Sequence, residues 1–187
     1  MRRICIYLYW IHGFVNKDDW VAVFAALEGV MGEKLRYLDT QDPVKRGAKR
    51  PADSATYTMD FQSEEMSRWL FGKFSRGRCT FTIRLSRDSV RNDCSIAVYL
   101  SEGVATPGEI SNLFMELVSA LNPFYGLCDL EEEVHAKRKK TGFSVDLEVE
   151  LLGVFWLTCF GSGYQDFFGL NQITLNGVEE ILSLIHI

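Results

Sequence analysis

The sequence predicts an α+β fold, an antiparallel sheet with helices packed mainly on one face. Residues 79–85 alternate apolar and polar side chains, residues 94–100 form a second apolar stretch, and turn residues 91–93 lie between them, which is typical of an antiparallel hairpin. Strand-like and helix-like segments are otherwise mixed, without the regular β–α alternation of a parallel sheet. A length of 187 residues, with 47% hydrophobic and 24% charged, predicts one globular domain over residues 1–187.

The N-terminal part is expected to contain a strand, a helix and a second, short strand. Residues 4–11 are rich in Ile, Tyr and Trp and no small-residue cleavage site follows them, which favours a buried strand over a secretory signal. Apolar residues then recur at helical spacing between a candidate N-terminal cap at Asn16 and a C-terminal cap at Gly32. They are Trp20, Phe24, Leu27 and Met31. Residues 35–38 are expected to form the short strand.

Two segments in the middle of the chain are interpreted from composition. Residues 41–54 contain Pro43, Pro51 and four basic side chains, which indicates a solvated loop. The alternative is a contact surface for an acidic partner. Residues 63–74 start at a candidate cap, Ser63, and carry several large apolar residues, so a short helix is expected there.

The clearest helix is expected over residues 107–121. Thr106 and Glu109 fit a capping box, and Pro107 occupies the first helical position. Six apolar residues then recur with the spacing of one helix face, which predicts that this face packs on the sheet. They are Ile110, Leu113, Phe114, Leu117, Val118 and Leu121. The Asn-Pro pair at residues 122–123 is expected to end the helix.

A charged segment follows this helix. Its acidic residues come first and its basic residues, 137–140, come last, which suits the dipole of a solvated helix. The alternative is an acidic surface that binds a partner, and four residues are our candidate contact surface. They are Asp129, Glu131, Glu132 and Glu133. Residues 150–160 are then expected to form a buried strand, followed by a compact aromatic segment, 164–168, between Gly163 and Gly169.

The last six residues, 182–187, read Leu-Ser-Leu-Ile-His-Ile. They resemble the translation of an adaptor used in preparing sequencing libraries. We therefore expect the native chain to be cut near Ile181, and we give His186 no functional weight. The alternative is an ordinary apolar C-terminal strand.

No motif in the sequence identifies a reaction, so we expect neither an enzyme nor a bound cofactor. A catalytic nucleophile needs a neighbouring base, and the two other histidines are interpreted as a turn residue, His12, and a solvated residue, His135. The five cysteines lack the short spacing of a zinc site, so no metal is expected. We expect them to be reduced and mostly buried.

Charge and hydropathy indicate which partners to exclude and in which compartment to expect the protein. A net charge of −5 argues against a general affinity for nucleic acid, because phosphate contacts require clustered basic residues. No apolar run approaches the length that spans a bilayer. Together with the cysteine usage, these features lead us to expect a cytoplasmic protein without nucleic-acid or membrane partners.

Three motifs in the C-terminal half carry a family resemblance. Residues 122–126 read Asn-Pro-Phe-Tyr-Gly, residues 153–158 read Gly-Val-Phe-Trp-Leu-Thr, and residues 164–169 end in glycine. Together they resemble the type VI immunity family and related uncharacterised bacterial proteins. The residues that carry the resemblance are Tyr125, Gly126, Gly153, Trp156, Gly161 and Gly169. We expect Gly153 to allow a close backbone approach and Trp156 to anchor the core.

The resemblance implies a non-enzymatic protein that binds and neutralises a cognate bacterial toxin. Such a role needs a complementary surface and no active site. Two alternatives remain: an enzyme of an unrecognised class that uses Glu131 or His12, and a structural or regulatory module of a phage-like or contractile system.

Overall fold

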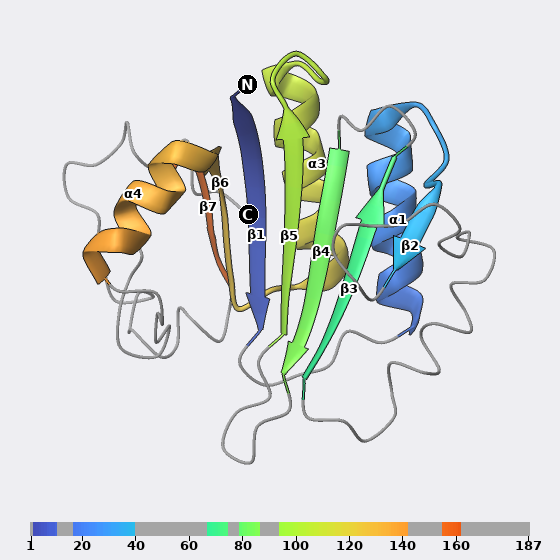
Figure 1. Cartoon of the computed structure of the whole chain (residues 1–187), viewed down its shortest axis with the longest axis horizontal. Helices are drawn as coiled ribbons and strands as arrows, with labels where there is room; N and C mark the ends of the chain where they lie inside the picture. Colours follow the sequence, from blue (N-terminus) through green and yellow to red (C-terminus); the bar gives the residue numbers. More distant parts are fainter. Residues whose placement is uncertain are drawn as a thin grey trace.

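The computed structural model describes residues 2–10, 17–39, 67–74, 79–86, 94–141 and 155–161. Within them, seven strands form one sheet in the order β2-β3-β4-β5-β1-β6-β7 (Figure 1). Every pair of neighbouring strands is antiparallel, which confirms the predicted α+β class. The elements are β1 Arg3–Trp10, α1 Lys17–Met31, β2 Tyr37–Asp39, β3 Ser67–Lys73, β4 Cys79–Ser86, β5 Cys94–Ser101, α3 Pro107–Leu121, β6 Tyr125–Leu130, α4 Glu131–Thr141 and β7 Leu157–Phe160.

The first strand, β1, has a neighbouring strand on each side. Ile6 of β1 lies opposite Val98 of β5 on one side and Cys128 of β6 on the other. The predicted hairpin is also present, because β4 pairs with β5 and places Ile83 opposite Ile96.

The two faces of the sheet are covered differently (Figure 1). Because side chains alternate along a strand, Ile6 and Leu8 of β1 join the larger apolar core, to which α1 and α3 contribute. Cys5 and Tyr7 point to the opposite face and join a smaller core with Val134 of α4. Two of the three described helices therefore share one face, as predicted, and α4 lies on the other.

The helix α3 has the predicted bounds and caps. The Thr106 hydroxyl accepts a hydrogen bond from the Glu109 amide, and the Glu109 carboxylate accepts one from the Thr106 amide. Asn122 ends the helix in the left-handed region, with φ 42°. All six residues of the predicted stripe are buried, which confirms that this face packs on the sheet.

The prediction of a helix over residues 63–74 is wrong for its described part, because Ser67–Lys73 form β3. Gly72 explains the difference, since it lies opposite Phe81 of β4. A Cβ on Gly72 would come within 2.0 Å of the Phe81 ring, so the missing side chain makes room for that ring. Glycine is also costly inside a helix, whereas aromatic residues such as Phe71 favour strands.

Other predictions agree with the described residues in part. Gly32 follows α1 with φ +61°, as expected of a helix C-cap. The short strand β2 comes later than residues 35–38, at Tyr37–Asp39. The strand expected over residues 150–160 is described only as Leu157–Phe160. All five cysteines are free and buried, as predicted: Cys5, Cys79, Cys94, Cys128 and Cys159.

Some predictions lie outside the described residues. They concern His12, Asn16, residues 41–54, Ser63, Gly153, Gly163, Gly169 and residues 182–187.

Candidate functional site

The candidate acidic segment lies where β6 passes directly into α4. Asp129 belongs to the end of β6, and the three glutamates Glu131, Glu132 and Glu133 form the first turn of α4. Carboxylates are favourable there because the amide groups at a helix N-terminus carry partial positive charge. The structure therefore brings the four predicted residues together, but their side chains have different environments.

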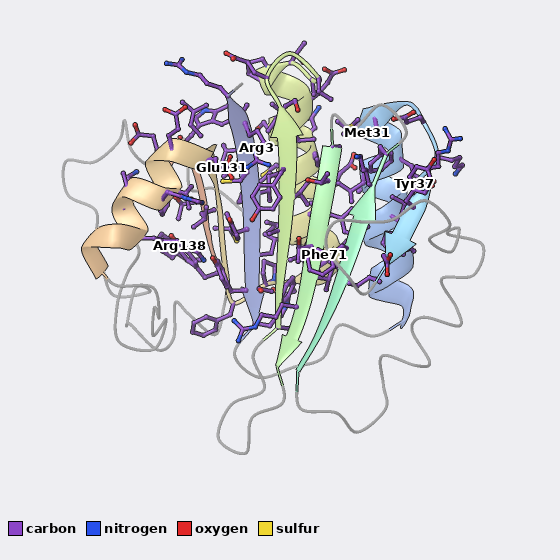
Figure 2. The ribbon with its side chains drawn as sticks, in the orientation of Figure 1. Arg3, Met31, Tyr37, Phe71, Glu131 and Arg138 are labelled. Atoms are coloured by element: carbon purple, nitrogen blue, oxygen red, sulfur yellow. The ribbon has the colours of Figure 1, made fainter. Side chains whose placement is uncertain are left out.

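Glu131 is bound within the protein. Its two carboxylate oxygens accept hydrogen bonds from the guanidinium of Arg3, both at 2.7 Å. Arg3 also lies over the ring of Tyr99, 5.3 Å from the ring centroid. Figure 2 shows Arg3 and Glu131 next to each other between β1 and α4. The pair ties the start of the first strand to the start of α4.

Asp129 is also engaged inside the fold. Its carboxylate accepts hydrogen bonds from the amides of Leu130 and Trp156, at 2.8 and 3.2 Å. The ammonium group of Lys137, on α4, lies 3.8 Å from the same carboxylate. Asp129 therefore connects β6, α4 and the segment that enters β7.

Glu132 and Glu133 are exposed at the start of α4. They are the two predicted contact residues whose carboxylates face solvent and can meet another molecule directly. Because Asp129 and Glu131 hold the helix in position, the structure divides the predicted set into two exposed groups and two structural ones. That the segment binds a partner stays a prediction.

Beneath α4 lies a cluster of tyrosines on β1 and β5, which we call the tyrosine face: Tyr7, Tyr9 and Tyr99. The hydroxyls of Tyr7 and Tyr99 are hydrogen-bonded at 2.8 Å. The guanidinium of Arg138, on α4, lies 4.6 Å from the Tyr7 ring centroid and 5.8 Å from the Tyr9 ring centroid. Arg138 also donates a hydrogen bond to the Tyr9 hydroxyl.

Sequence reasoning missed the tyrosine face. The available signal was the i, i+2 spacing of Tyr7 and Tyr9, which places both on one face of a strand. Nothing in the sequence pattern indicated that Arg138 would cover them, because 129 residues separate Arg138 from Tyr9.

The titratable groups of the tyrosine face are held in their neutral forms. Burial raises the pKa of Tyr7, Tyr9 and Tyr99 above the ordinary tyrosine value. Burial, followed by the negative charge of Glu131, raises the pKa of Cys5 to about 12. At neutral pH one hydroxyl of the Tyr7–Tyr99 pair donates to the other, the Tyr9 hydroxyl accepts from Arg138, and the Cys5 thiol is a poor nucleophile because the reactive form is the thiolate.

The described residues contain no group of three or more His, Cys, Asp and Glu side chains arranged to hold a metal ion. Nor does any helix in the described ranges have both the length and the hydropathy needed to cross a bilayer.

Two glycines of the resemblance motifs are sites of close packing. A Cβ on Gly126 would lie 2.9 Å from the Leu8 side chain, and a Cβ on Gly161 would lie 2.0 Å from the carbonyl oxygen of Pro123. The Gly161 amide donates a hydrogen bond to the Phe124 carbonyl at 3.0 Å. Tyr125 is fully buried between these segments.

The expectation that Trp156 anchors the core is wrong. Trp156 is 36% exposed, while its neighbour Phe155 is 3% exposed and belongs to the smaller core. Trp156 precedes β7, which begins at Leu157, so it is not part of the buried strand that was expected over residues 150–160.

Comparison with solved structures finds the fold of this chain in other proteins. A T6SS (type VI secretion system) protein of Pseudomonas aeruginosa aligns with 70% of this chain, with a TM-score of 0.52 and 16% sequence identity. The aligned region covers 42% of that protein, so this chain spans less than half of its length. No family model matches the chain, and no curated protein matches it. The likeness shows a shared α+β fold.

Proposed function

We propose that this chain is a non-enzymatic immunity protein of a type VI secretion context, which binds and neutralises a cognate toxin. The observation that carries the proposal is the fold shared with a T6SS protein over 70% of the chain. The motifs at residues 122–126 and 153–158 support the immunity role in particular, because they resemble the type VI immunity family.

The start of α4 is the proposed contact surface. Glu132 and Glu133 are exposed there, while the bidentate pair of Glu131 with Arg3 fixes the helix turn that carries them. Clustered carboxylates of this kind steer a partner with a basic surface toward the site and set partner choice. A toxin whose active cleft is basic, as in a nuclease, would be masked by such a surface.

Co-expression in a bacterial host tests this proposal. The product of the gene adjacent to and upstream of this one is expected to be lethal alone, and this chain is expected to restore growth. A parallel culture expresses Leu117→Ala, which keeps the surface but loses core packing, to show how far protection depends on folded protein. If the neighbouring product is harmless alone, or stays lethal beside the folded chain, the immunity proposal fails.

A second candidate is a structural or regulatory module of a contractile secretion system. The same fold likeness favours it, since the similar protein is named only as a T6SS protein. This candidate predicts that deletion of the gene abolishes secretion without making the cell sensitive to a neighbouring toxin. The immunity proposal predicts the reverse.

A further inference from the structure

The helix α4 is attached to the sheet in a different way from α3. Six apolar side chains of α3 are buried in the larger core. In α4, by contrast, Val134 is the one fully buried apolar side chain among the described residues 131–138. Its sequence, Glu-Glu-Glu-Val-His-Ala-Lys-Arg-Lys-Lys-Thr, has no apolar stripe. Removal of α4 would therefore expose far less apolar surface than removal of α3.

Charged side chains supply the remaining contacts of α4. Arg138 lies over Tyr7 and Tyr9 of the tyrosine face, and the ammonium group of Lys137 lies 4.3 Å from the centroid of the Phe155 ring. At the other end of the helix, Glu131 pairs with Arg3. The two ion pairs of α4, Glu131 with Arg3 and Lys137 with Asp129, are weakened by salt, whereas apolar burial is not weakened in this way.

The helix depends on these contacts to remain helical. It has eleven residues, and isolated helices shorter than about 12–15 residues are marginal in water. The strand β6 ends at Leu130 and α4 begins at the next residue, so this junction can act as a hinge while β6 stays paired with β1. Loss of the docking contacts would therefore undock and unwind α4 without breaking the sheet.

We propose that α4 is a salt-sensitive cover that opens separately from the rest of the fold and exposes the tyrosine face when it does. The ion pairs make the cover sensitive to salt, and Arg138 adds a cation–π fastening, because it contacts both tyrosines of β1. The inference rests on the contacts of α4 and is independent of the proposed function.

Hydrogen–deuterium exchange of the wild-type chain tests the opening. Raising salt from about 0.1 M to about 1 M shortens the Debye length from about 10 Å to about 3 Å. The amides of α4 are expected to exchange several-fold faster at the higher salt, while those of α3 keep their rates. Equal changes in both helices, or no change in α4, would overturn the proposal.

Substitution of Arg138 tests the fastening. Arg138→Gln keeps much of the side-chain length and removes the cation, and it is expected to speed exchange in α4 about tenfold, which corresponds to about 1.4 kcal/mol. Arg138→Lys retains the cation and is expected to have a smaller effect. Glu116→Gln removes an exposed charge from α3 and serves as the control.

Each outcome of the substitution bears on the proposal. Faster exchange confined to α4 in Arg138→Gln, with a smaller change in Arg138→Lys, supports it. If α3 exchange rises as much as α4 exchange, the two helices unfold together and α4 is no separate cover. If Arg138→Gln behaves like Glu116→Gln, the cation does not fasten the helix.

Discussion

Gly161 lies where the chain passes against the backbone that follows α3. The nearest atom to an added Cβ would be a carbonyl oxygen, that of Pro123, at 2.0 Å. A backbone atom held by neighbouring structure cannot rotate away as a flexible side chain can. The hydrogen bond from the Gly161 amide to Phe124 depends on the same close approach. The glycine of this motif therefore has a packing role.

Gly161→Ala is expected to destabilise the protein by about 1–3 kcal/mol, because the added methyl overpacks a fixed backbone contact. The free energy of unfolding in urea measures this effect. Gly29→Ala is the matched control, since a Cβ there meets nothing within 4 Å. In the last turn of α1 that substitution should stabilise the protein by about 0.4–1 kcal/mol. Two glycine substitutions with the same effect would contradict the packing role.

The buried thiols make the stability of the fold depend on pH. Burial, followed by the charge of Glu33, raises the pKa of Cys79 from 9.0 to about 12. The folded state thus binds the thiol proton more tightly than the unfolded state. The contribution of the Cys79 thiol to the free energy of unfolding is complete below pH 9 and is lost as the pH rises toward 12.

Between pH 8 and pH 10, the wild-type chain should lose about 1.4 kcal/mol more unfolding free energy than Cys79→Ala. The reason is that the variant has no thiol at this position, so its stability no longer depends on the ionisation of Cys79. Urea unfolding in the presence of a reductant measures both chains at both pH values. The variant starts from a lower stability, so the slope with pH is the quantity compared. Equal slopes would show that the Cys79 thiol is not held neutral by the fold.

The helix α3 and the strand β3 show what local sequence can and cannot predict. The bounds of α3 follow from its caps and its apolar spacing, which are local signals. The strand β3, by contrast, depends on a long-range contact: Gly72 lies opposite Phe81 of the adjacent strand, and the ring of Phe81 fills the space of the missing side chain. Local spacing of Trp69, Leu70 and Phe74 is compatible with a helix, and the pairing with β4 overrides it.

Leu117→Ala tests the role of the α3 stripe. Leu117 is fully buried in the larger core, so the variant should lose about 2–5 kcal/mol of unfolding free energy through lost burial and a cavity. Met115→Ala removes a 37% exposed side chain from the same helix and should change stability by no more than about 0.5 kcal/mol. A loss smaller than about 2 kcal/mol for Leu117→Ala, with the fold intact, would show that the stripe is not core.

The position of the candidate acidic segment in the fold was predictable from the sequence, but the role of each of its carboxylates was not. The run of acidic residues is visible in the sequence, and it lies at the start of a helix as expected. Its division into structural and exposed carboxylates depends on Arg3, which is 128 residues away from Glu131, and on Trp156. Contacts across such separations follow from the order of strands in the sheet, which no local pattern specifies.

The exposed glutamates of α4, Glu132 and Glu133, are expected to steer the encounter with a partner. If the start of α4 contacts a basic toxin surface, Glu132→Gln/Glu133→Gln should slow association about tenfold at low salt and leave dissociation nearly unchanged, because exposed charges act mainly on encounter. Glu102→Gln/Glu116→Gln is the matched control, since both pairs are exposed and both variants have a net charge of −3 in place of −5.

Association and dissociation rates are measured against the toxin that co-expression identifies, at low and at high salt. The difference between the two double variants should shrink as salt rises, because screening removes the steering that only the α4 pair supplies. Equal slowing by both variants would assign the effect to net charge alone. Unchanged association in the α4 variant would place the contact elsewhere on the molecule, while the immunity proposal itself would still depend on the growth assay.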